Sequence, residues 1–466
     1  MELFNTINGA VNDFVWGVPA IVLIMGVGLY LTIRLKGVQF KNWGFLIKNT
    51  YVKALNTAKE EDKQVKKEGE ISSFQAAMAS VSAVVGSGNI AGVATAIVAG
   101  GPGALFWMII AALVGMATKF AEIALGVKYR QKAADGTMVS GPMYYIEKGL
   151  HAPWLGKIVS VLFIFYSVII SAVVDTNSIS QAFNEEFGLN PIITGAILAV
   201  LCGIVIFGGI KRIGEVCGIL SPFMAGAYLL FGLLIILMNI TRVPAAIALI
   251  VKAAFNPQAV LGGAAGVTIA TAMSKGMARG IFSNEAGVGS AAVTHGSAMV
   301  NHPGEQAIWG PFEVFVDTII VCSITGITIV LSGLYTEGLD GTALTMSAFK
   351  TMLPGNWGQY IVLGASLLFG FSCLITFYNY MEKGWISLFG PKGTLFAKVL
   401  WLVFIMIGSY STLGFVWDLA DTCNGLIIIP NMIALAIMAK EVVQIKDEYI
   451  GVELPKYKEE KAKKKA

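Results

Sequence analysis

Residues 73–101 read SFQAAMASVSAVVGSGNIAGVATAIVAGG, an apolar stretch interrupted at its centre by Gly86-Ser87-Gly88-Asn89. Glycine costs about 1 kcal/mol in a helix interior and frees the backbone from helical geometry. Backbone that unwinds at bilayer depth is tolerated only where it lines a cavity enclosed by protein. We therefore expect a membrane helix over 72–99 that is broken in its middle.

Two other interpretations of this stretch exist. Small residues can simply let a neighbouring helix approach closely, as small-xxx-small pairs do. A nucleotide-binding loop is disfavoured, because GSGNIAG lacks the GxGxxG spacing and no strand precedes it. The choice between close packing and a cavity depends on the rest of the chain.

The composition indicates a membrane protein. The chain has 466 residues, of which 56% are hydrophobic and 13% are charged. Soluble domains carry about 25% charged residues, so this chain has too little polar surface for a water-exposed fold. A bilayer core needs roughly 20 apolar residues per helix, and such runs recur from end to end. We expect one all-α integral membrane domain with eleven transmembrane helices, at 13–34, 72–99, 103–130, 155–175, 190–209, 214–239, 258–282, 306–334, 358–381, 394–414 and 416–439.

The basic residues predict the orientation. The connection 35–71 holds eight lysines, and such residues concentrate in cytoplasmic loops. Placing this connection in the cytoplasm puts the N-terminus outside the cell membrane and the C-terminus inside. The chain then divides into an extra N-terminal helix with its cytoplasmic linker (1–71), two five-helix repeats (72–239 and 240–440) and a cytoplasmic tail (441–466). We expect the last part of this tail, KYKEEKAKKKA at 456–466, to be solvated and disordered.

A second interruption is predicted in the helix over 258–282, at 271–276 (TAMSKG). Because five helices separate the two breaks, the broken helices cross the membrane in opposite directions, as the two halves of an inverted repeat do. Interrupted helices at corresponding positions of two halves are the best sequence indication of a transporter's binding site. This pairing favours a cavity over close packing.

The first break suits a zwitterion and a cation. The second half of the broken helix begins at Asn89, so the amides of Gly88 and Asn89 can bind a carboxylate at a helix N-terminus. Its first half ends near Val84 and Val85, whose carbonyls favour a cation. We expect no carboxylate at this midplane site, which favours sodium held by neutral oxygens over a proton. The candidate substrate-binding residues are Gln75, Ser80, Gly86, Ser87, Gly88, Asn89, Thr271, Met273, Gly276 and Phe371.

Three separated motifs are familiar. GGPGALFWM at 100–108, followed by IIAALVG, resembles the signature of the alanine or glycine:cation symporter family, also called sodium:alanine symporters. The stretch 73–97 and GMARGIFSNEAGVGSAA at 276–292 are similar to that family too, and the resemblance runs from about Phe14 to about Lys440. Ile109 departs from the family, which usually has a second tryptophan there, and Cys373 stands where a hydroxyl is expected.

The resemblance implies a leucine-transporter-type fold, a 5+5 inverted repeat with one extra N-terminal helix. It also implies sodium-coupled symport of alanine, and of glycine, into the cell by alternating access. The implied partners are the small amino acid, sodium and the lipid bilayer, with no nucleic acid, no cofactor, no transition metal and no enzymatic activity. The implied sodium ligands are the carbonyls of Ser82 and Val85 and residues of the ninth helix, Phe369, Ser372 and Cys373.

Ionisable residues inside apolar segments are candidate functional residues. Lys119 and Glu122 lie three apart on one helix face, where they can pair as a structural element or a gate. Glu313 and Asp317 are four apart on the eighth helix, and as gate candidates they can face water or the basic residues of the seventh helix. Solvation is the expected state of Asp418 and Asp421, and of His151, His295 and His302.

The motif FSNEAGVGS at 282–290 falls at a cytoplasmic helix end in this topology, where we expect an exposed linker with glycine turns. A membrane enzyme is weakly supported, because neither HExxH nor GxSxG occurs. An ion channel is the other rival. It usually repeats one pore segment or forms a ring-shaped filter, whereas this chain has two different broken helices.

Overall fold

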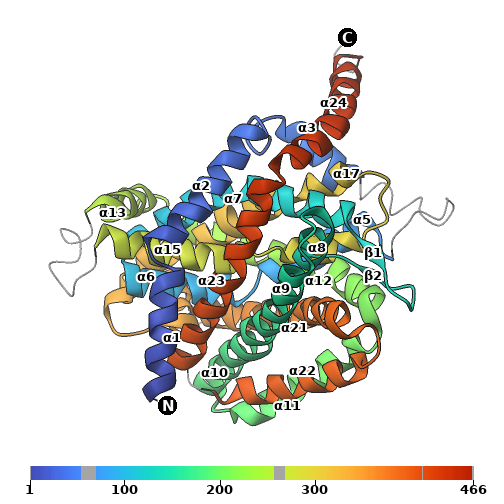
Figure 1. Ribbon diagram of the computed structural model, residues 1–466. Helices are drawn as coiled ribbons and strands as arrows, with labels where there is room; N and C mark the ends of the chain where they lie inside the picture. Colours follow the sequence, from blue (N-terminus) through green and yellow to red (C-terminus); the bar gives the residue numbers. More distant parts are fainter. Residues whose placement is uncertain (1, 54–69, 257–267, 356, 412, 464–466) are drawn as a thin grey trace.

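The computed structural model describes residues 2–53, 70–256, 268–355, 357–411 and 413–463, and most of them are helical (Figure 1). The described strands form one antiparallel hairpin, β1 (Gln131–Lys132) and β2 (Met138–Val139). By length and composition, six helices in the described ranges can cross a membrane, or seven if one bent pair counts as a span. Four shorter apolar helices accompany them, so the predicted count of eleven spans is not established by helix length.

The predicted break in the second span is present. Helix α5 (Ser73–Val84) is followed by η2 (Gly88–Gly92) and α6 (Val93–Gly100), and the two parts meet at an angle of 43°. A capping box starts α5, because Ser72 and Gln75 each accept a hydrogen bond from the other's backbone amide. Gln75 therefore fixes the start of α5, about three turns before the break.

The second break lies elsewhere than predicted. Helix α15 (Ile269–Asn284) is continuous through 271–276, and the interruption falls at 285–289, before α16 (Ser290–Gly296). The glycines of the two segments have different backbone conformations. Gly287 and Gly289 have φ of +105° and +89°, values that residues other than glycine rarely adopt. Gly276 is helical instead, and a Cβ there would collide with the carbonyl of Ala104. The predicted start of this span at 258 lies outside the described residues.

Two further spans are built from helices in series. One is α9 (Pro153–Ser167), η3 (Val168–Asp175) and α10 (Thr176–Phe187); the other is α17 (Pro303–Ala307), α18 (Trp309–Val314), η4 (Phe315–Cys322) and α19 (Ser323–Ser332). The η2, η3 and η4 segments are π-helical, a rare conformation that occurs frequently at functional sites. The remaining long helices are α7 (Gly103–Lys128), α11 (Pro191–Ile206), α12 (Gly209–Met238), α21 (Trp357–Phe389), α22 (Thr394–Ser409) and α23 (Leu413–Ile437).

The first predicted span is a pair of helices, α1 (Glu2–Val15) and α2 (Val18–Arg34), that meet at Trp16–Gly17. The pair packs on α23, and α2 also packs on α7. Shorter helices complete the fold: α3 (Trp43–Ile47), η1 (Lys48–Val52), α8 (Pro142–Gly149), α13 (Val243–Phe255), η5 (Leu334–Thr336) and α20 (Gly341–Met352).

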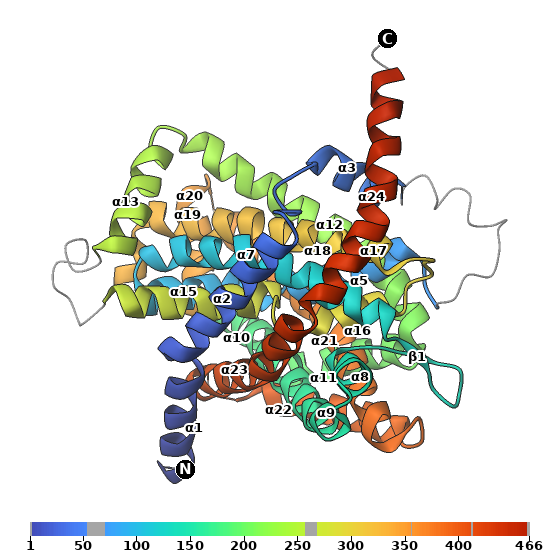
Figure 2. The same ribbon diagram turned by 45° about the horizontal axis from the view of Figure 1, so that its top comes forward.

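The segment 456–466, predicted to be disordered, is helical in its described part, 456–463. Helix α24 (Ala439–Lys463) extends away from the bundle toward the C-terminus (Figure 2). Val442, Ile445 and Tyr449 are buried, and α24 packs on α17. The buried apolar residues on the first turns of α24 anchor the helix to the bundle. The lysine-rich end alone gives no indication of this helix.

Candidate functional site

The two breaks lie against each other. A Cβ on Gly88 would lie 3.0 Å from the Cα of Ser283 and 3.1 Å from Cδ1 of Phe282. The end of α15 therefore covers the start of η2. This close approach requires glycine at position 88, as the close-packing interpretation of the small residues expects.

Asp317 joins the breaks. It lies in η4, is fully buried, and accepts hydrogen bonds from Nδ2 of Asn89 at 2.6 Å and from the hydroxyl of Ser283 at 3.0 Å. The hydroxyl of Thr318 also donates to it at 2.6 Å. One carboxylate thus binds a residue from each broken span.

A second aspartate reaches the first break from η3. The Ser87 hydroxyl donates to Oδ1 of Asp175 at 2.5 Å, and the Gly86 amide donates to Oδ1 of Asn89 at 2.8 Å. The expectation that no carboxylate lies at this site is therefore wrong. Asp175 and Asp317 are distant in sequence from the break, and the helix packing brings them to it.

The second break is held by α7. Oε1 of Glu122 accepts from the amides of Gly287 at 2.8 Å and Gly289 at 2.9 Å. The ammonium of Lys119 donates to the carbonyl of Asn284 at 2.7 Å, at the C-terminus of α15. Each charge lies where the backbone dipoles favour it. The two side chains thus hold opposite ends of the 285–289 segment, which is buried and not the exposed linker that we expected.

Glu313 anchors a buried polar cluster beside α5. It accepts from the Ser80 hydroxyl at 2.8 Å and lies 2.6 Å from Nε2 of His295 and 3.8 Å from Nζ of Lys119. His295 is fully buried, so its predicted solvation is wrong. Ser80, a predicted substrate ligand, is engaged by this cluster.

The predicted sodium ligands lie together. The hydroxyl of Ser372 lies 3.1 Å from the carbonyl oxygen of Ser82 and 2.8 Å from that of Phe369. The thiol of Cys373 lies 3.3 Å from the same Ser82 carbonyl. Val85 is the C-terminal cap of α5, where its carbonyl leaves the helix. These hard oxygens fit a sodium ion, and the weak thiol ligand has the Asp175 carboxylate beside it.

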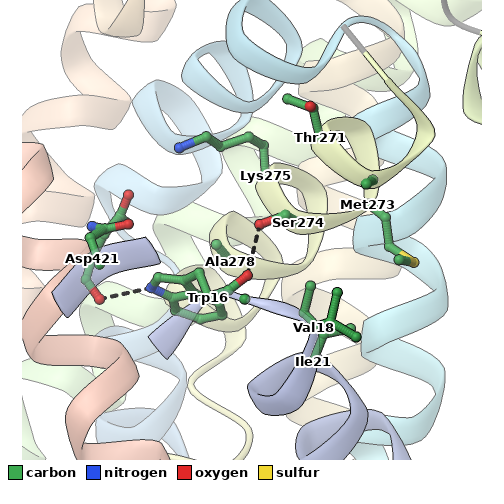
Figure 3. Close-up of a pocket in the computed structure, with 12 residues that line it drawn as sticks. Trp16, Val18, Ile21, Thr271, Met273, Ser274, Lys275, Ala278 and Asp421 are labelled. Carbon is green, nitrogen blue, oxygen red and sulfur yellow. Dashed lines mark hydrogen bonds between the residues drawn. The ribbon is translucent and has the colours of Figure 1, made fainter. Parts of the chain in front are cut away.

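The other predicted substrate residues lie elsewhere. Thr271 and Met273 line a separate cavity on α15 (Figure 3). Gly276 packs on α7, and Phe371 is half-buried against the hydrophobic core. The structure thus places Gln75, Thr271, Met273 and Gly276 away from the break residues Gly86, Ser87, Gly88 and Asn89. Phe371 lies on the α21 segment that passes the break, since a Cβ on Gly370 would lie 3.7 Å from Cβ of Asp175.

A layer of large side chains covers the first break. Phe282 packs on Trp417 with ring centroids 4.9 Å apart, and the guanidinium of Arg279 lies 4.5 Å from the Trp417 ring. Arg279 forms an ion pair with Asp421 and donates to the Thr95 hydroxyl at 3.0 Å. Asp421 is 4% exposed, so its predicted solvation is wrong. Arg279 faces Asp421, not Glu313 or Asp317.

The buried charges around the breaks do not balance. Five carboxylates there are at most 3% exposed, those of Glu122, Asp175, Glu285, Glu313 and Asp317. Lys119 is the ammonium that contacts this group in the described part of the chain. If all five are ionised and His295, 2.6 Å from Glu313, is neutral, one ammonium leaves four negative charges without a cationic partner. Isolated charges in a low-dielectric interior need a counter-ion or a proton.

Sequence reasoning missed three of these acids as site residues. Asp175 stands at the last position of the predicted span 155–175, Asp317 was given a gate role, and Glu285 was placed in an exposed linker. The signal that could have found them is their position inside apolar segments. Their partners come from other helices, and no local spacing shows those partners.

Comparison with solved structures supports the fold. The chain aligns with MhsT in complex with L-phenylalanine at a TM-score of 0.55 and 14% identity, covering 82% of this chain and 99% of MhsT. It aligns with a Na+-coupled sialic acid symporter at a TM-score of 0.51 and 13% identity, covering 95% and 86%. These likenesses show the leucine-transporter-type fold.

Sequence relatives identify the family. A model of the family described as sodium:alanine symporters matches residues 1–465. The Methanococcus maripaludis sodium/alanine symporter AgcS is 42% identical, over 95% of this chain and 96% of AgcS. GlnT of Bacillus subtilis, named a probable sodium/glutamine symporter, is 37% identical over 96% of this chain and 91% of GlnT. This multi-pass membrane protein is therefore a transporter and not an enzyme, and it belongs to the sodium:alanine symporter family of sodium-coupled amino-acid symporters.

Proposed function

We propose that the protein carries alanine, and glycine, into the cell together with sodium by alternating access. The observation that carries this proposal is the first break itself. It combines a helix start bounded by Gly88 and Asn89 with a cluster of oxygens from Ser82, Phe369 and Ser372. A helix start binds a carboxylate, and hard oxygens bind a cation.

In this proposal the substrate carboxylate binds the amides of Gly88 and Asn89, and it replaces the Gly86 carbonyl, to which the Asn89 amide donates at 3.2 Å. The substrate side chain must fit beside Phe282 and Ser283, which already approach Gly88 within van der Waals distance. Overpacking such a site typically costs 1–3 kcal/mol. Alanine and glycine should therefore compete with each other, while leucine and glutamine should not.

Sodium binds the carbonyls of Ser82, Val85 and Phe369 and the hydroxyl of Ser372. One sodium that crosses a potential of 100 mV releases about 2.3 kcal/mol. At about 1.4 kcal/mol per tenfold, this corresponds to roughly fifty-fold accumulation before the sodium gradient adds to it.

A proton is the rival coupling ion, and the buried Asp175 and Asp317 carboxylates are the observation that favours it. Counterflow of labelled alanine in liposomes separates the two. We expect uptake with a sodium gradient and none with a pH gradient alone. Uptake driven by pH in sodium-free buffer would replace sodium by a proton, and failure of alanine to exchange under any gradient would reject the substrate.

The N-terminus faces outward and the C-terminus faces the cytoplasm in this proposal. The distribution of basic residues supports that orientation, because the lysine-rich connection 35–71 is cytoplasmic in it. Sodium entering down its gradient then moves the amino acid inward.

A further inference from the structure

The C-terminal half of α21 contains buried polar side chains whose polar atoms lack partners in the described part of the chain. Asn379 and Tyr380 lie four and three residues before Lys383, so the three share one face of the helix. All three are 0% exposed. Both amide atoms of Asn379, the Tyr380 hydroxyl and Nζ of Lys383 have no hydrogen-bond partner among the described residues. Buried polar groups in folded proteins are normally paired, so this cluster requires water or an ion.

The charge of Lys383 is compensated only in part. Its Nζ lies 3.9 Å from Oε2 of Glu382, beyond hydrogen-bond distance, and Oε1 of Glu382 accepts from the Tyr378 hydroxyl at 2.7 Å. Asp135 also interacts with this charge, but it is exposed on the β1–β2 hairpin, where solvent screens it. Because a buried ammonium without acceptors is costly, the N–H groups of Lys383 require an acceptor that these acids do not supply.

Lys119 shows how this fold supports a buried ammonium with its own atoms. It is also fully buried, and its Nζ donates to the Asn284 carbonyl at 2.7 Å and lies 3.8 Å from the Glu313 carboxylate. The two lysines thus have a carboxylate at a similar distance, but in the described structure Lys119 has a hydrogen-bond acceptor and Lys383 has none. This difference indicates that the acceptor of Lys383 comes from outside the chain.

The cluster is rich in hydrogen-bond donors. The Lys383 ammonium offers three N–H groups, the Asn379 amide two, and the Tyr380 hydroxyl one O–H. Water can accept these hydrogen bonds but leaves the charge of Lys383 uncompensated, whereas an anion supplies both. The close packing favours a small ion, because a Cβ on the neighbouring Gly384 would lie 3.1 Å from the Ser160 carbonyl of α9.

We propose that Lys383, Asn379 and Tyr380 form a binding site for a small inorganic anion, and that chloride fills it. The ion accepts hydrogen bonds from the Lys383 ammonium and the Asn379 amide, and it leaves no net charge at this point of the interior. The carboxylate of a free amino acid carries the same charge on a larger group, and the experiment below separates the two.

The anion site shares a helix face with the proposed sodium site. Ser372 lies eleven residues before Lys383, about 16 Å along the helix axis, and the buried Thr376 lies between them on the same face. At that distance and an effective dielectric constant of about 20, two unit charges change each other's binding about fivefold. The anion should therefore lower the sodium concentration for half-maximal uptake about fivefold. This second consequence rests on the proposed function.

Binding is tested without transport, on purified full-length protein in N-methylglucamine salts at constant ionic strength and without alanine. Replacing gluconate by chloride should raise the thermal midpoint of the wild type in a saturable way, since a ligand of the folded state stabilises it. Lys383→Met should lose this shift. Asn379→Asp should lose it too, because a carboxylate four residues before Lys383 supplies the missing anion. Lys392→Met removes an exposed cation after α21 and should keep the shift.

Uptake of labelled alanine into liposomes at zero membrane potential then measures the sodium requirement. With gluconate in place of chloride on both sides, the wild type should need about fivefold more sodium for half-maximal uptake. Lys383→Met and Asn379→Asp should show the wild-type chloride value in both anions, because neither has an uncompensated cation to repel sodium. If one of the two variants does not fold, the other still gives the comparison.

A wild-type midpoint that is the same in chloride and gluconate would show that water fills the cluster, and it would overturn the proposal. So would a chloride shift that persists in both Lys383→Met and Asn379→Asp. Stabilisation by alanine in gluconate that Lys383→Met abolishes would identify the amino-acid carboxylate as the occupant and would overturn the assignment to chloride. A chloride shift with an unchanged sodium requirement would support the anion site and contradict the proposed place of sodium. Absence of alanine uptake by the wild type would reject the proposed function and leave the midpoint test valid.

Discussion

Asp175 and Asp317 illustrate how single residues define this site. Each lies in a π-helical segment of its own span, and each binds one residue of the first break, Ser87 or Asn89. Both side chains are buried, so each depends on hydrogen-bond donors and on cations that enter the site. The site is therefore more acidic than the break alone suggests.

Ser372 supplies the hydroxyl of the proposed sodium site. Ser372→Ala should raise the sodium concentration for half-maximal uptake about fivefold to tenfold, since one polar contact contributes roughly 1–1.5 kcal/mol. Alanine affinity at saturating sodium should change less. Cys373→Ser is the matched control and should leave the sodium requirement unchanged or lower it. A folded, active Ser372→Ala protein with wild-type sodium dependence would exclude this site.

Gly88 is a position where a side chain has no space. Gly88→Val should abolish alanine binding measured by calorimetry, because its Cβ would press on Ser283 and Phe282. Gly364→Val on α21 is the control, since a Cβ there meets nothing within 4 Å. Near-normal alanine binding by Gly88→Val would place the substrate site elsewhere.

At the scale of elements, the sequence predicted one break well and misplaced the other. Gly86-Ser87-Gly88-Asn89 shows the first break because its glycines stand inside an apolar run. The glycine at 276 gave a similar local signal, but it packs a helix against α7. Gly287 and Gly289 form the true break. Both have positive φ values, and the amide of Gly287 donates to Glu122 of α7, a helix far away in the sequence. Such pairings depend on tertiary packing and have no local pattern.

Gly289, in the second break, has a backbone conformation that favours glycine. Gly289→Ala should lower the free energy of unfolding by more than about 1–2 kcal/mol, because its φ is +89° and its Cβ would lie 2.8 Å from Cγ of Pro142. It should also impair transport, because its amide donates a hydrogen bond to Glu122. Gly333→Ala after α19 has a similar φ of +76° and open space around it. It should lower the thermal midpoint less than Gly289→Ala does and should transport normally. Equal transport by both variants at a temperature where both are folded would contradict this role of the second break.

The whole molecule must be oriented for inward transport. The described cysteines are buried except Cys423, which is partly buried, so a Cys423→Ser background is suited to labelling. Thr336→Cys, exposed after α19, should react with an impermeant maleimide on intact cells. Ala134→Cys, exposed in the β1–β2 hairpin, should react only after permeabilisation. The reverse pattern would invert the topology.

The surplus of buried carboxylates has a consequence for leakage. A cavity that opens beside these carboxylates during transport would keep its water, since expelling that water would leave the charges unsolvated. When too few cations are bound, the protein therefore resists the closed state, in which water is excluded from the central site. It then does not reach the state that is open on the other side of the membrane. Movement of the amino acid without its cations is then suppressed by electroneutrality of the interior, because a zwitterion adds no net charge to the site.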